Sequence, residues 1–286
     1  MYPEYPFQSH YFQIGSNRIH YVDEGEGDVI VMVHGNPTWS FYYRRLISLL
    51  AGQHRVIAID HLGCGLSDKP QDYNYCLQNH IDNLAALLDH LEVKTFGLCV
   101  HDWGGAIGFG MAGERPEALT RALVLNTAAF RSQRIPLRIS VCRWPLVGKT
   151  LVRGLNGFAG PAVSMAVNRK MSQEVAAAYL APYDSWKNRV AVAAFVKDIP
   201  LTSDHSSYRT LVRVEQGLEK FQESKLPMLI CWGGKDFCFN KHFYDEWCER
   251  FPEAESHYFE EGGHYILEDE FEEIAPLARQ FFEGSR

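Results

Sequence analysis

The stretch Thr95-Phe96-Gly97-Leu98-Cys99-Val100-His101-Asp102-Trp103-Gly104-Gly105 decides the fold. Its first six residues form a short, largely apolar run, typical of a strand covered on both faces, and a helical pattern begins at Ala106. A polar residue after a strand, followed by glycines that lead into a helix, is the pattern of a nucleophile elbow, where the tight backbone requires small residues. The residue at the tip of this predicted elbow is Asp102.

Asp102 predicts a particular chemistry, because the chain contains no Gly-x-Ser-x-Gly pattern. A carboxylate attacks saturated carbon by displacement and forms an ester between the substrate's carbon and the protein. A solvated aspartate that caps the N-terminus of a helix is the simpler interpretation of the same residue. The other motifs favour the nucleophile.

The rest of the chain alternates between predicted strands and helices, which predicts a mostly parallel, doubly wound α/β sheet. Residues 11–14 and 17–23 alternate like a hairpin. Short apolar runs predict strands at 29–33, 56–59, 95–100, 122–125 and 228–232, and residues 256–259 are also strand-like. Helical periodicity is found at 41–51, 78–91, 106–115 and 271–282.

This alternation stops in the middle of the chain. We expect an α/β core formed by residues 1–130 and 223–286, and a helical cap formed by residues 131–222 over the carboxyl edge of the sheet, where such folds bind ligands. The apolar stretches 155–163 and 190–196 either line a hydrophobic channel or form ordinary helix cores.

Two further residues are predicted to assist Asp102. The loop His34-Gly35-Asn36-Pro37-Thr38-Trp39-Ser40 follows the strand 29–33, and the backbone N–H groups of Asn36 and Trp103 are placed to hold an oxygen of Asp102. Their side chains are neutral donors for a leaving group. Alternatively, the loop is only a turn and Trp103 only a core residue.

His264 and Asp236 complete a predicted triad in the order nucleophile, acid, histidine. His264 lies in Glu261-Gly262-Gly263-His264-Tyr265, before the last helix, where the base is expected. Asp236 follows the buried strand 228–232, whereas the rival strand end Leu125-Asn126-Thr127 offers no carboxylate. The alternative for Asp236 is a turn-forming residue. His34 and His101 precede the acid and better fit packing and hydrogen-bonding roles.

Composition and charge exclude several other classes of protein. The chain has 286 residues and a net charge of −7, which argues against nucleic-acid binding. Seven cysteines without a Cys-x-x-Cys pair, together with the lack of an export signal or a transmembrane run, predict a cytoplasmic protein without a zinc site. The pattern Gly108-Phe109-Gly110-Met111-Ala112-Gly113 lies inside a predicted helix and is not a dinucleotide site, so we expect no cofactor and no metal.

The motifs at 34–39 and 101–105 resemble those of the haloalkane dehalogenase-like branch of the α/β-hydrolase family, and the resemblance covers the whole chain. It implies Asp102 as nucleophile, His264 as base, Asp236 as the acid that orients His264, and Asn36 with Trp103 as leaving-group ligands. Three further stretches, 60–70, 126–130 and 236–239, resemble the β-lactone decarboxylases of bacterial long-chain olefin biosynthesis.

This second resemblance implies conversion of a cis-3,4-dialkyl-β-lactone, a small lipophilic substrate, to a cis-alkene and CO2. It also implies a thiolase, a reductase and a β-lactone synthetase as pathway partners. Haloalkane dehalogenation is the alternative, and epoxide hydrolysis the third, for which Tyr179 and Tyr183 offer cap hydroxyls at helical spacing. A catalytically silent binding protein of the same fold needs no complete triad.

Overall fold

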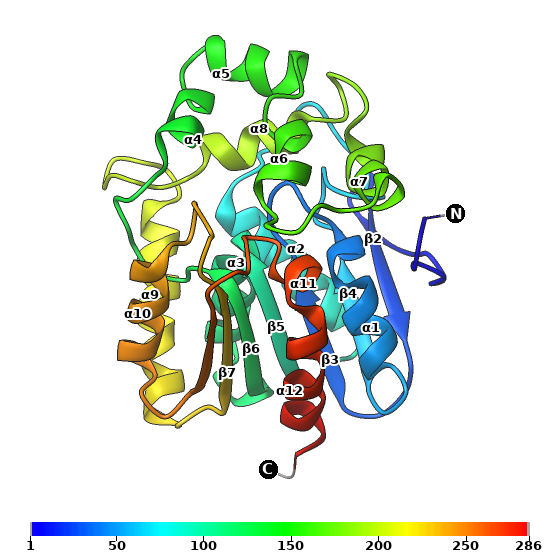
Figure 1. Ribbon diagram of the computed structural model, residues 1–286, viewed down its shortest axis with the longest axis vertical. Helices are drawn as coiled ribbons and strands as arrows, with labels where there is room; N and C mark the ends of the chain where they lie inside the picture. Colours follow the sequence, from blue (N-terminus) through cyan, green and yellow to red (C-terminus); the bar gives the residue numbers. More distant parts are fainter. Residues whose placement is uncertain (1, 285–286) are drawn as a thin grey trace.

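Residues 2–284 are described by a computed structural model and form an eight-stranded sheet with helices on both faces (Figure 1). The strand order is β1-β2-β4-β3-β5-β6-β7-β8, and every neighbouring pair is parallel except β1 with β2 and β2 with β4. This confirms the predicted doubly wound sheet. The strands are β1 (His10–Ile14), β2 (Asn17–Glu24), β3 (Val29–Val33), β4 (Arg55–Ile59), β5 (Phe96–Asp102), β6 (Leu119–Thr127), β7 (Met228–Gly233) and β8 (Glu255–Phe259).

The apolar runs form strands because each side of the sheet has its own core. Along β3, Val31 and Val33 belong to the core on one face, whereas Ile30 and Met32 belong to the core on the other. Successive side chains of a strand point to opposite faces, so a strand covered on both sides is apolar at every position.

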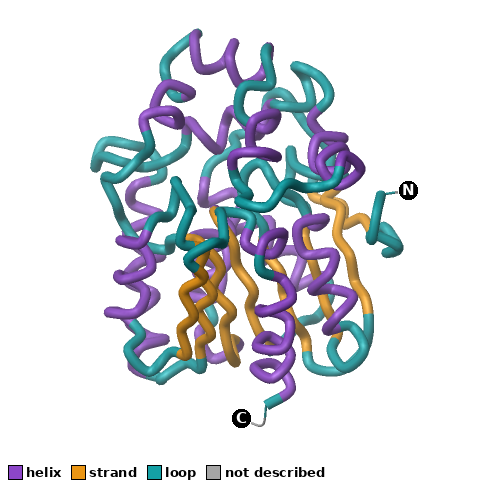
Figure 2. Tube along the Cα trace, in the orientation of Figure 1, coloured by secondary structure: helices purple, strands orange, loops and turns teal. Residues whose placement is uncertain are grey.

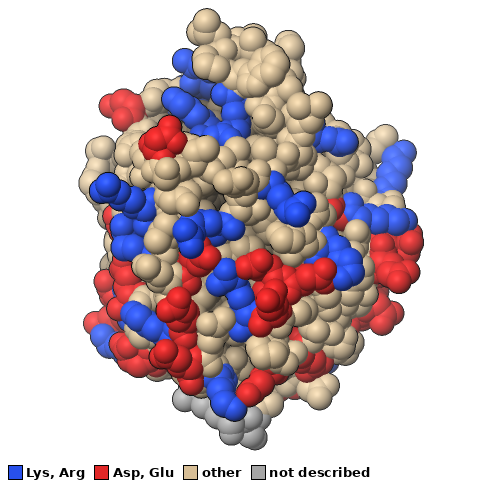
Figure 3. All heavy atoms as spheres, turned by 90° about the vertical axis from the view of Figure 1, so that its left-hand side faces the viewer, with Lys and Arg blue, Asp and Glu red and all other residues tan. Residues whose placement is uncertain are grey.

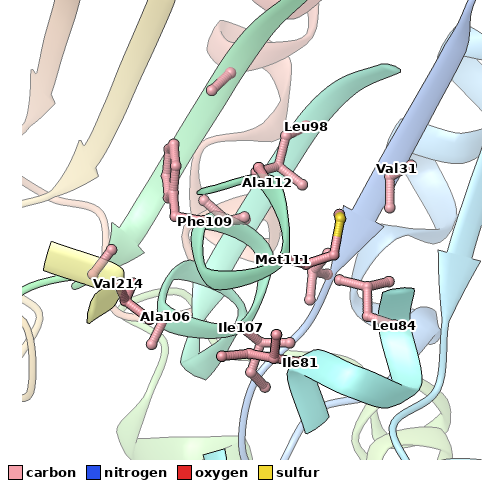
Figure 4. Close-up of a cluster of buried hydrophobic side chains, with 14 of the residues drawn as sticks. Val31, Ile81, Leu84, Leu98, Ala106, Ile107, Phe109, Met111, Ala112 and Val214 are labelled. Carbon is pink, nitrogen blue, oxygen red and sulfur yellow. The ribbon is translucent and has the colours of Figure 1, made fainter. Parts of the chain in front are cut away.

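The two cores lie under two sets of helices. The first set includes α2 (Leu77–His90), α3 (Trp103–Glu114) and α9 (Tyr208–Glu223). The second set includes α1 (Arg44–Leu50), α11 (Ile266–Asp269) and α12 (Phe271–Glu283). Helix α10 (Lys241–Arg250) packs near β6. Figure 4 shows Phe109, Met111 and Ala112 of α3 among side chains of the sheet and of neighbouring helices. A helix that is apolar all round is buried, and α3 therefore holds the end of β5 firmly in the core.

The remaining α-helices and one π-helical turn lie over the carboxyl edge of the sheet (Figures 1 and 2). They are α4 (Leu137–Cys142), α5 (Val147–Lys149), the π-helical turn η3 (Thr150–Gly154), α6 (Ala159–Met165), α7 (Gln173–Leu180) and α8 (Val190–Lys197). The division into a core of 1–130 and 223–286 and a cap of 131–222 stays a proposal. Helix α9 falls within the cap by these bounds, although it packs beside α3 of the core. None of the helices in residues 2–284 is long and apolar enough to cross a membrane.

Gly104, in the first turn of α3, sets how closely this helix approaches β3. A Cβ at Gly104 would lie 1.9 Å from the carbonyl oxygen of Val33, so a side chain there requires the backbone to move. We expect Gly104→Ala to lower the free energy of unfolding by about 3 kcal/mol, measured by denaturant titration.

The matched control is Gly113→Ala in the last turn of the same helix. Its Cβ would meet only the Cα of Gly217, at an ordinary contact distance of 3.6 Å. Alanine is the better helix former, so this variant should be as stable as the parent or slightly more stable. Equal losses in both variants would contradict the steric argument.

Candidate active site

Asp102 is the last residue of β5, and α3 begins directly after it, three residues earlier than the pattern predicted. Its backbone has φ 54° and ψ −127°, a conformation that costs a residue with a side chain about 1–3 kcal/mol. The neighbours hold it there. The hydroxyl of Thr127 donates to the carbonyl oxygen of Asp102, and the backbone N–H of Asn36 donates to its Oδ1 at 2.5 Å.

Gly35 makes this approach possible. A Cβ at Gly35 would lie 2.0 Å from Oδ1 of Asp102, so any side chain at that position would displace the carboxylate. The loop after β3 and the elbow after β5 therefore fit together because one of them carries no side chain.

His264 and Asp236 lie beside Asp102, and the structure brings all three predicted residues together. Asp236 follows β7 and His264 lies between β8 and α11. Nδ1 of His264 is 2.7 Å from Oδ2 of Asp236, and Nε2 is 3.6 Å from Oδ2 of Asp102. All three residues are buried. The imidazole thus connects the two carboxylates, with Nε2 facing the elbow.

The electrostatics of the three groups are coupled. Burial raises the pKa of Asp102, although His264 and the backbone N–H groups of Asn36 and Trp103 act in the opposite direction. Burial alone would lower the pKa of His264, but Asp236 and then Asp102 raise it above its ordinary value. The site therefore favours a positive charge on His264 and keeps Asp102 less solvated than a surface carboxylate, which increases the reactivity of the anion.

Asp236 is held by groups that the sequence reasoning did not single out as a site. The side-chain amide of Asn126 donates to Oδ2 at 3.0 Å, and the backbone N–H groups of Cys238 and Phe239 donate to Oδ1 at 2.6 and 3.1 Å. Asn126 also exchanges two hydrogen bonds with the backbone of Gly233. The signal for Asn126 is its place at the end of β6, beside the strand that leads to Asp236.

We expect Asp236→Asn to lower the pKa of His264, because the carboxylate is the largest factor that raises it. The measurement is an NMR titration of the His264 imidazole in the parent and the variant. Asn126→Ala serves as the comparison, since it removes a hydrogen bond from Asp236 but leaves its charge, and its effect on the pKa should be the smaller one. An unchanged pKa in Asp236→Asn would contradict the assigned coupling.

Asn36 and Trp103 both line the cavity in front of Asp102. The side-chain amide of Asn36 donates to the carbonyl oxygen of Val192 at 3.2 Å, and because an amide carries two N–H bonds, a second donor remains. The predicted contact of their backbone N–H groups with Asp102 is present in the structure. A role of the two side chains as leaving-group ligands stays a prediction.

The cavity has a volume of about 270 Å³ and contains Asp102 and His264 in its wall. Most of the other lining side chains are apolar and come from both cap and core, among them Ile135, Ile139, Phe158, Val196, Leu211 and Phe237. Of the two apolar stretches in the cap, 155–163 contributes several lining residues, whereas 190–196 contributes only Val196. The arrangement offers a carboxylate nucleophile to an apolar molecule.

The other histidines near the elbow are bound to the backbone. Nδ1 of His34 is 2.7 Å from the carbonyl oxygen of Gly35, and Nε2 of His101 is 2.8 Å from that of His264. Both fit the packing role that was predicted. The two cap tyrosines also bond elsewhere: the hydroxyl of Tyr179 donates to Glu268 and that of Tyr183 to the carbonyl oxygen of Thr38.

Comparison with known proteins shows which family the chain belongs to. The profile of the alpha/beta hydrolase fold matches residues 28–271. The chain is 47% identical over 283 residues to the cis-3-alkyl-4-alkyloxetan-2-one decarboxylase of Shewanella oneidensis, covering 96% of this chain and 88% of the relative. It is 40% identical to the protein of the same name from Xanthomonas campestris pv. campestris, covering 99% and 98%.

Haloalkane dehalogenases are more distant relatives. Haloalkane dehalogenase 2 of Mycobacterium tuberculosis is 31% identical over 95% of this chain and 93% of the relative. Among solved structures, a haloalkane dehalogenase loop variant from Bradyrhizobium elkanii superposes with a TM-score of 0.87 over 97% of both chains, at 24% identity, which supports the fold alone. The chain therefore belongs to the alpha/beta hydrolase family.

Proposed function

We propose that the protein is a cis-3-alkyl-4-alkyloxetan-2-one decarboxylase, which converts a β-lactone with two alkyl chains to a cis-alkene and CO2. One observation carries the chemistry of the proposal, namely that an aspartate, and no serine, stands at an elbow that faces an apolar cavity. The two relatives of this name are also more similar to the chain than the dehalogenases are.

In the first step, the Asp102 carboxylate attacks the ring carbon that bears the lactone oxygen. A new C–O bond forms to Asp102, and the ring C–O bond breaks with inversion at carbon. The electron pair of the broken bond stays on the former ring oxygen, which becomes part of a free carboxylate. The backbone N–H of Asn36, bonded to Oδ1, holds the nucleophile in position. The side chains of Asn36 and Trp103 support the charge that develops on the departing oxygen.

In the second step, the bond between the carboxylate and the neighbouring ring carbon breaks. Its electron pair forms the carbon–carbon double bond, and the C–O bond to Asp102 breaks, so that CO2 and the free Asp102 carboxylate result. Inversion followed by anti elimination leaves both alkyl groups on the same side of the alkene. The sequence of steps consumes no water and transfers no proton.

His264 therefore acts in this scheme as a positioning and charge-stabilising group. Asp236 raises its pKa, and in its protonated form the imidazole stabilises the carboxylate formed in the first step and the Asp102 anion released in the second. Attack of Asp102 at the lactone carbonyl is the competing first step. The acyl C–O bond of the ring breaks, which gives a mixed anhydride with Asp102 and an alkoxide on the other ring carbon. That alkoxide oxygen still has to leave the carbon before an alkene can form.

Haloalkane dehalogenation is the second candidate function. It shares the displacement step, and the 3.6 Å separation of Nε2 of His264 from Oδ2 of Asp102 leaves His264 able to activate water against an alkyl ester at Asp102. For epoxide hydrolysis, neither Tyr179 nor Tyr183 is among the residues that line the cavity.

The test is multiple turnover in ¹⁸O-labelled water, followed by mass spectrometry of the peptide that contains Asp102. With a cis-dialkyl-β-lactone, the proposed elimination yields alkene and an unlabelled Asp102. A bromoalkane, if accepted, should label Asp102, because water attacks its carbonyl carbon. Label in Asp102 after lactone turnover would reject the elimination, and formation of hydroxy acid without alkene would reject the decarboxylase.

The proposed substrate also requires a source, which is the reason to propose pathway partners. A β-lactone-forming enzyme must act immediately before this protein, and a thiolase and a reductase precede it in the pathway that the resemblance implies. We place the protein in the cytoplasm, which suits the seven free cysteines. Co-purification of the four enzymes from cells that express them tests the assembly.

A further inference from the structure

The cap carries an unusual share of exposed apolar side chains. Eight large hydrophobic residues are exposed within residues 2–284, and only Tyr11 lies outside the cap. Leu146 is 82% exposed and Trp144 is 56% exposed, and both stand next to α5 at the end of the molecule that is farthest from the sheet (Figure 1). We call the seven residues the cap apex: Leu137, Trp144, Leu146, Val147, Leu155, Met165 and Trp186.

Positive charge predominates in the segment that carries most of the cap apex. Residues 131–173 contain eight Lys and Arg and no Asp or Glu, although the whole chain has a net charge of −7. Arg134, Arg138 and Lys149 are exposed and form no ion pair within the described residues. Figure 3 shows one face of the molecule on which Lys and Arg gather beneath the tan upper end with a few Asp or Glu beside them, whereas most Asp and Glu lie in the lower half.

The same surface leads to the active-site cavity. Arg138 of α4 and Met165 of α6 are both exposed, both line the cavity, and contact each other, with Nη1 of Arg138 3.9 Å from Sδ of Met165. Leu137, which precedes Arg138, belongs to the cap apex. An alkyl chain on this surface thus meets apolar side chains between the solvent and the cavity that contains Asp102.

We propose that the cap apex docks on a membrane surface of anionic lipid. Trp and Leu side chains enter the boundary between headgroups and acyl chains, and Lys and Arg bind the anionic headgroups, which is the combination that interfacial proteins use. A symmetric dimer through this face is disfavoured, because an isologous interface would bring the cationic segment against its own copy.

Docking deepens the proposed function, and this part of the inference rests on it. A β-lactone with two long alkyl chains partitions into lipid, and the docked cap would present the cavity mouth to the bilayer. Membrane binding itself is measurable without any substrate. Its failure would leave the decarboxylase proposal standing, and failure of the decarboxylase would leave the docking surface standing.

The experiment is sedimentation of the protein with vesicles of phosphatidylcholine containing roughly 30% phosphatidylglycerol, with pure phosphatidylcholine vesicles as comparison. The test variant combines Trp144→Asp, Leu146→Asp and Lys149→Glu, three exposed positions that do not line the cavity. The control combines Tyr11→Asp and Lys94→Glu, exposed positions outside the cap that add acidic charge of a similar amount elsewhere on the surface.

We expect the parent and the control to bind the anionic vesicles and the test variant to bind at least about tenfold more weakly. Turnover of a short-chain, water-dissolved substrate should be unchanged in all three, whereas turnover of a vesicle-borne long-chain lactone should fall only in the test variant. Three results would overturn the proposal: no binding by the parent, equal binding by the test variant, or a dimer of the parent in lipid-free solution that the test variant loses. Duplex DNA binding that exceeds vesicle binding would also overturn it.

Discussion

Replacement of Asp102 by asparagine should abolish turnover of both lactone and bromoalkane, by about four orders of magnitude or more, while the fold is retained. The amide keeps the shape of the carboxylate and its oxygen can still accept the N–H of Asn36, but it is not a nucleophile. The measurement is single-turnover product formation with the purified variant. Asp102→Ala accompanies it, because an alanine cannot hydrolyse back to aspartate during the assay.

Asp102→Asn should also stabilise the protein above neutral pH. Burial raises the pKa of Asp102, so this carboxyl group contributes stability below its unfolded-state pKa, and that contribution is lost as the pH rises through its folded-state pKa. Asp102→Asn removes the loss. We expect a gain of about 1 kcal/mol at pH 8 that disappears near pH 4, measured by denaturant unfolding across that range. A variant less stable than the parent at pH 8 would contradict the burial argument.

His264→Ala should separate the two candidate reactions. Hydrolysis of an alkyl ester needs His264 to activate water, so dehalogenation should fall about 10⁴-fold and the alkyl-protein should accumulate as a mass increase on Asp102. The elimination transfers no proton, and decarboxylation should therefore fall only about 10- to 100-fold, through lost positioning and lost positive charge. Intact-protein mass spectrometry and alkene yield measure both effects.

The control for this experiment is His264→Gln, which fills more of the space left by the imidazole and is neutral at every pH. If it restores lactone turnover relative to alanine, His264 acts mainly through position; if it does not, the positive charge matters more. Equal losses of about 10⁴-fold in both reactions would show that decarboxylation also depends on proton transfer, and would reject the elimination scheme.

The fold was predictable because its strands carry their own signal. The run at 29–33 is apolar throughout and forms a strand covered on both faces, at the bounds that the pattern predicted. The elbow was predictable from its glycines. Gly104 leaves room for the backbone of Val33, and Gly105 leaves room for the side chain of Thr127. The pattern predicts the start of α3 three residues too late, because Gly104 and Gly105 are poor helix formers although they belong to its first turn.

The site was predictable where chain order fixes it, and unpredictable where two distant strand ends meet. Asp236 and His264 follow from their order after Asp102, and the structure brings them together. The bond between Asn126 and Asp236 depends on β6 lying beside β7, which no local pattern contains. Likewise, the spacing of Tyr179 and Tyr183 predicts one helix face, whereas their hydroxyls donate to different partners.

The backbone of Asp102 has a wider consequence. Gly35 and Gly104 allow its conformation because they carry no side chain, and the hydroxyl of Thr127 bonds its carbonyl oxygen. None of these three contacts depends on which side chain residue 102 carries. The backbone around residue 102 can therefore hold nucleophiles of different chemical type in the same position. The reaction of such a protein therefore depends on which residue stands at this position and on the groups around its side chain, and the fold alone does not determine it.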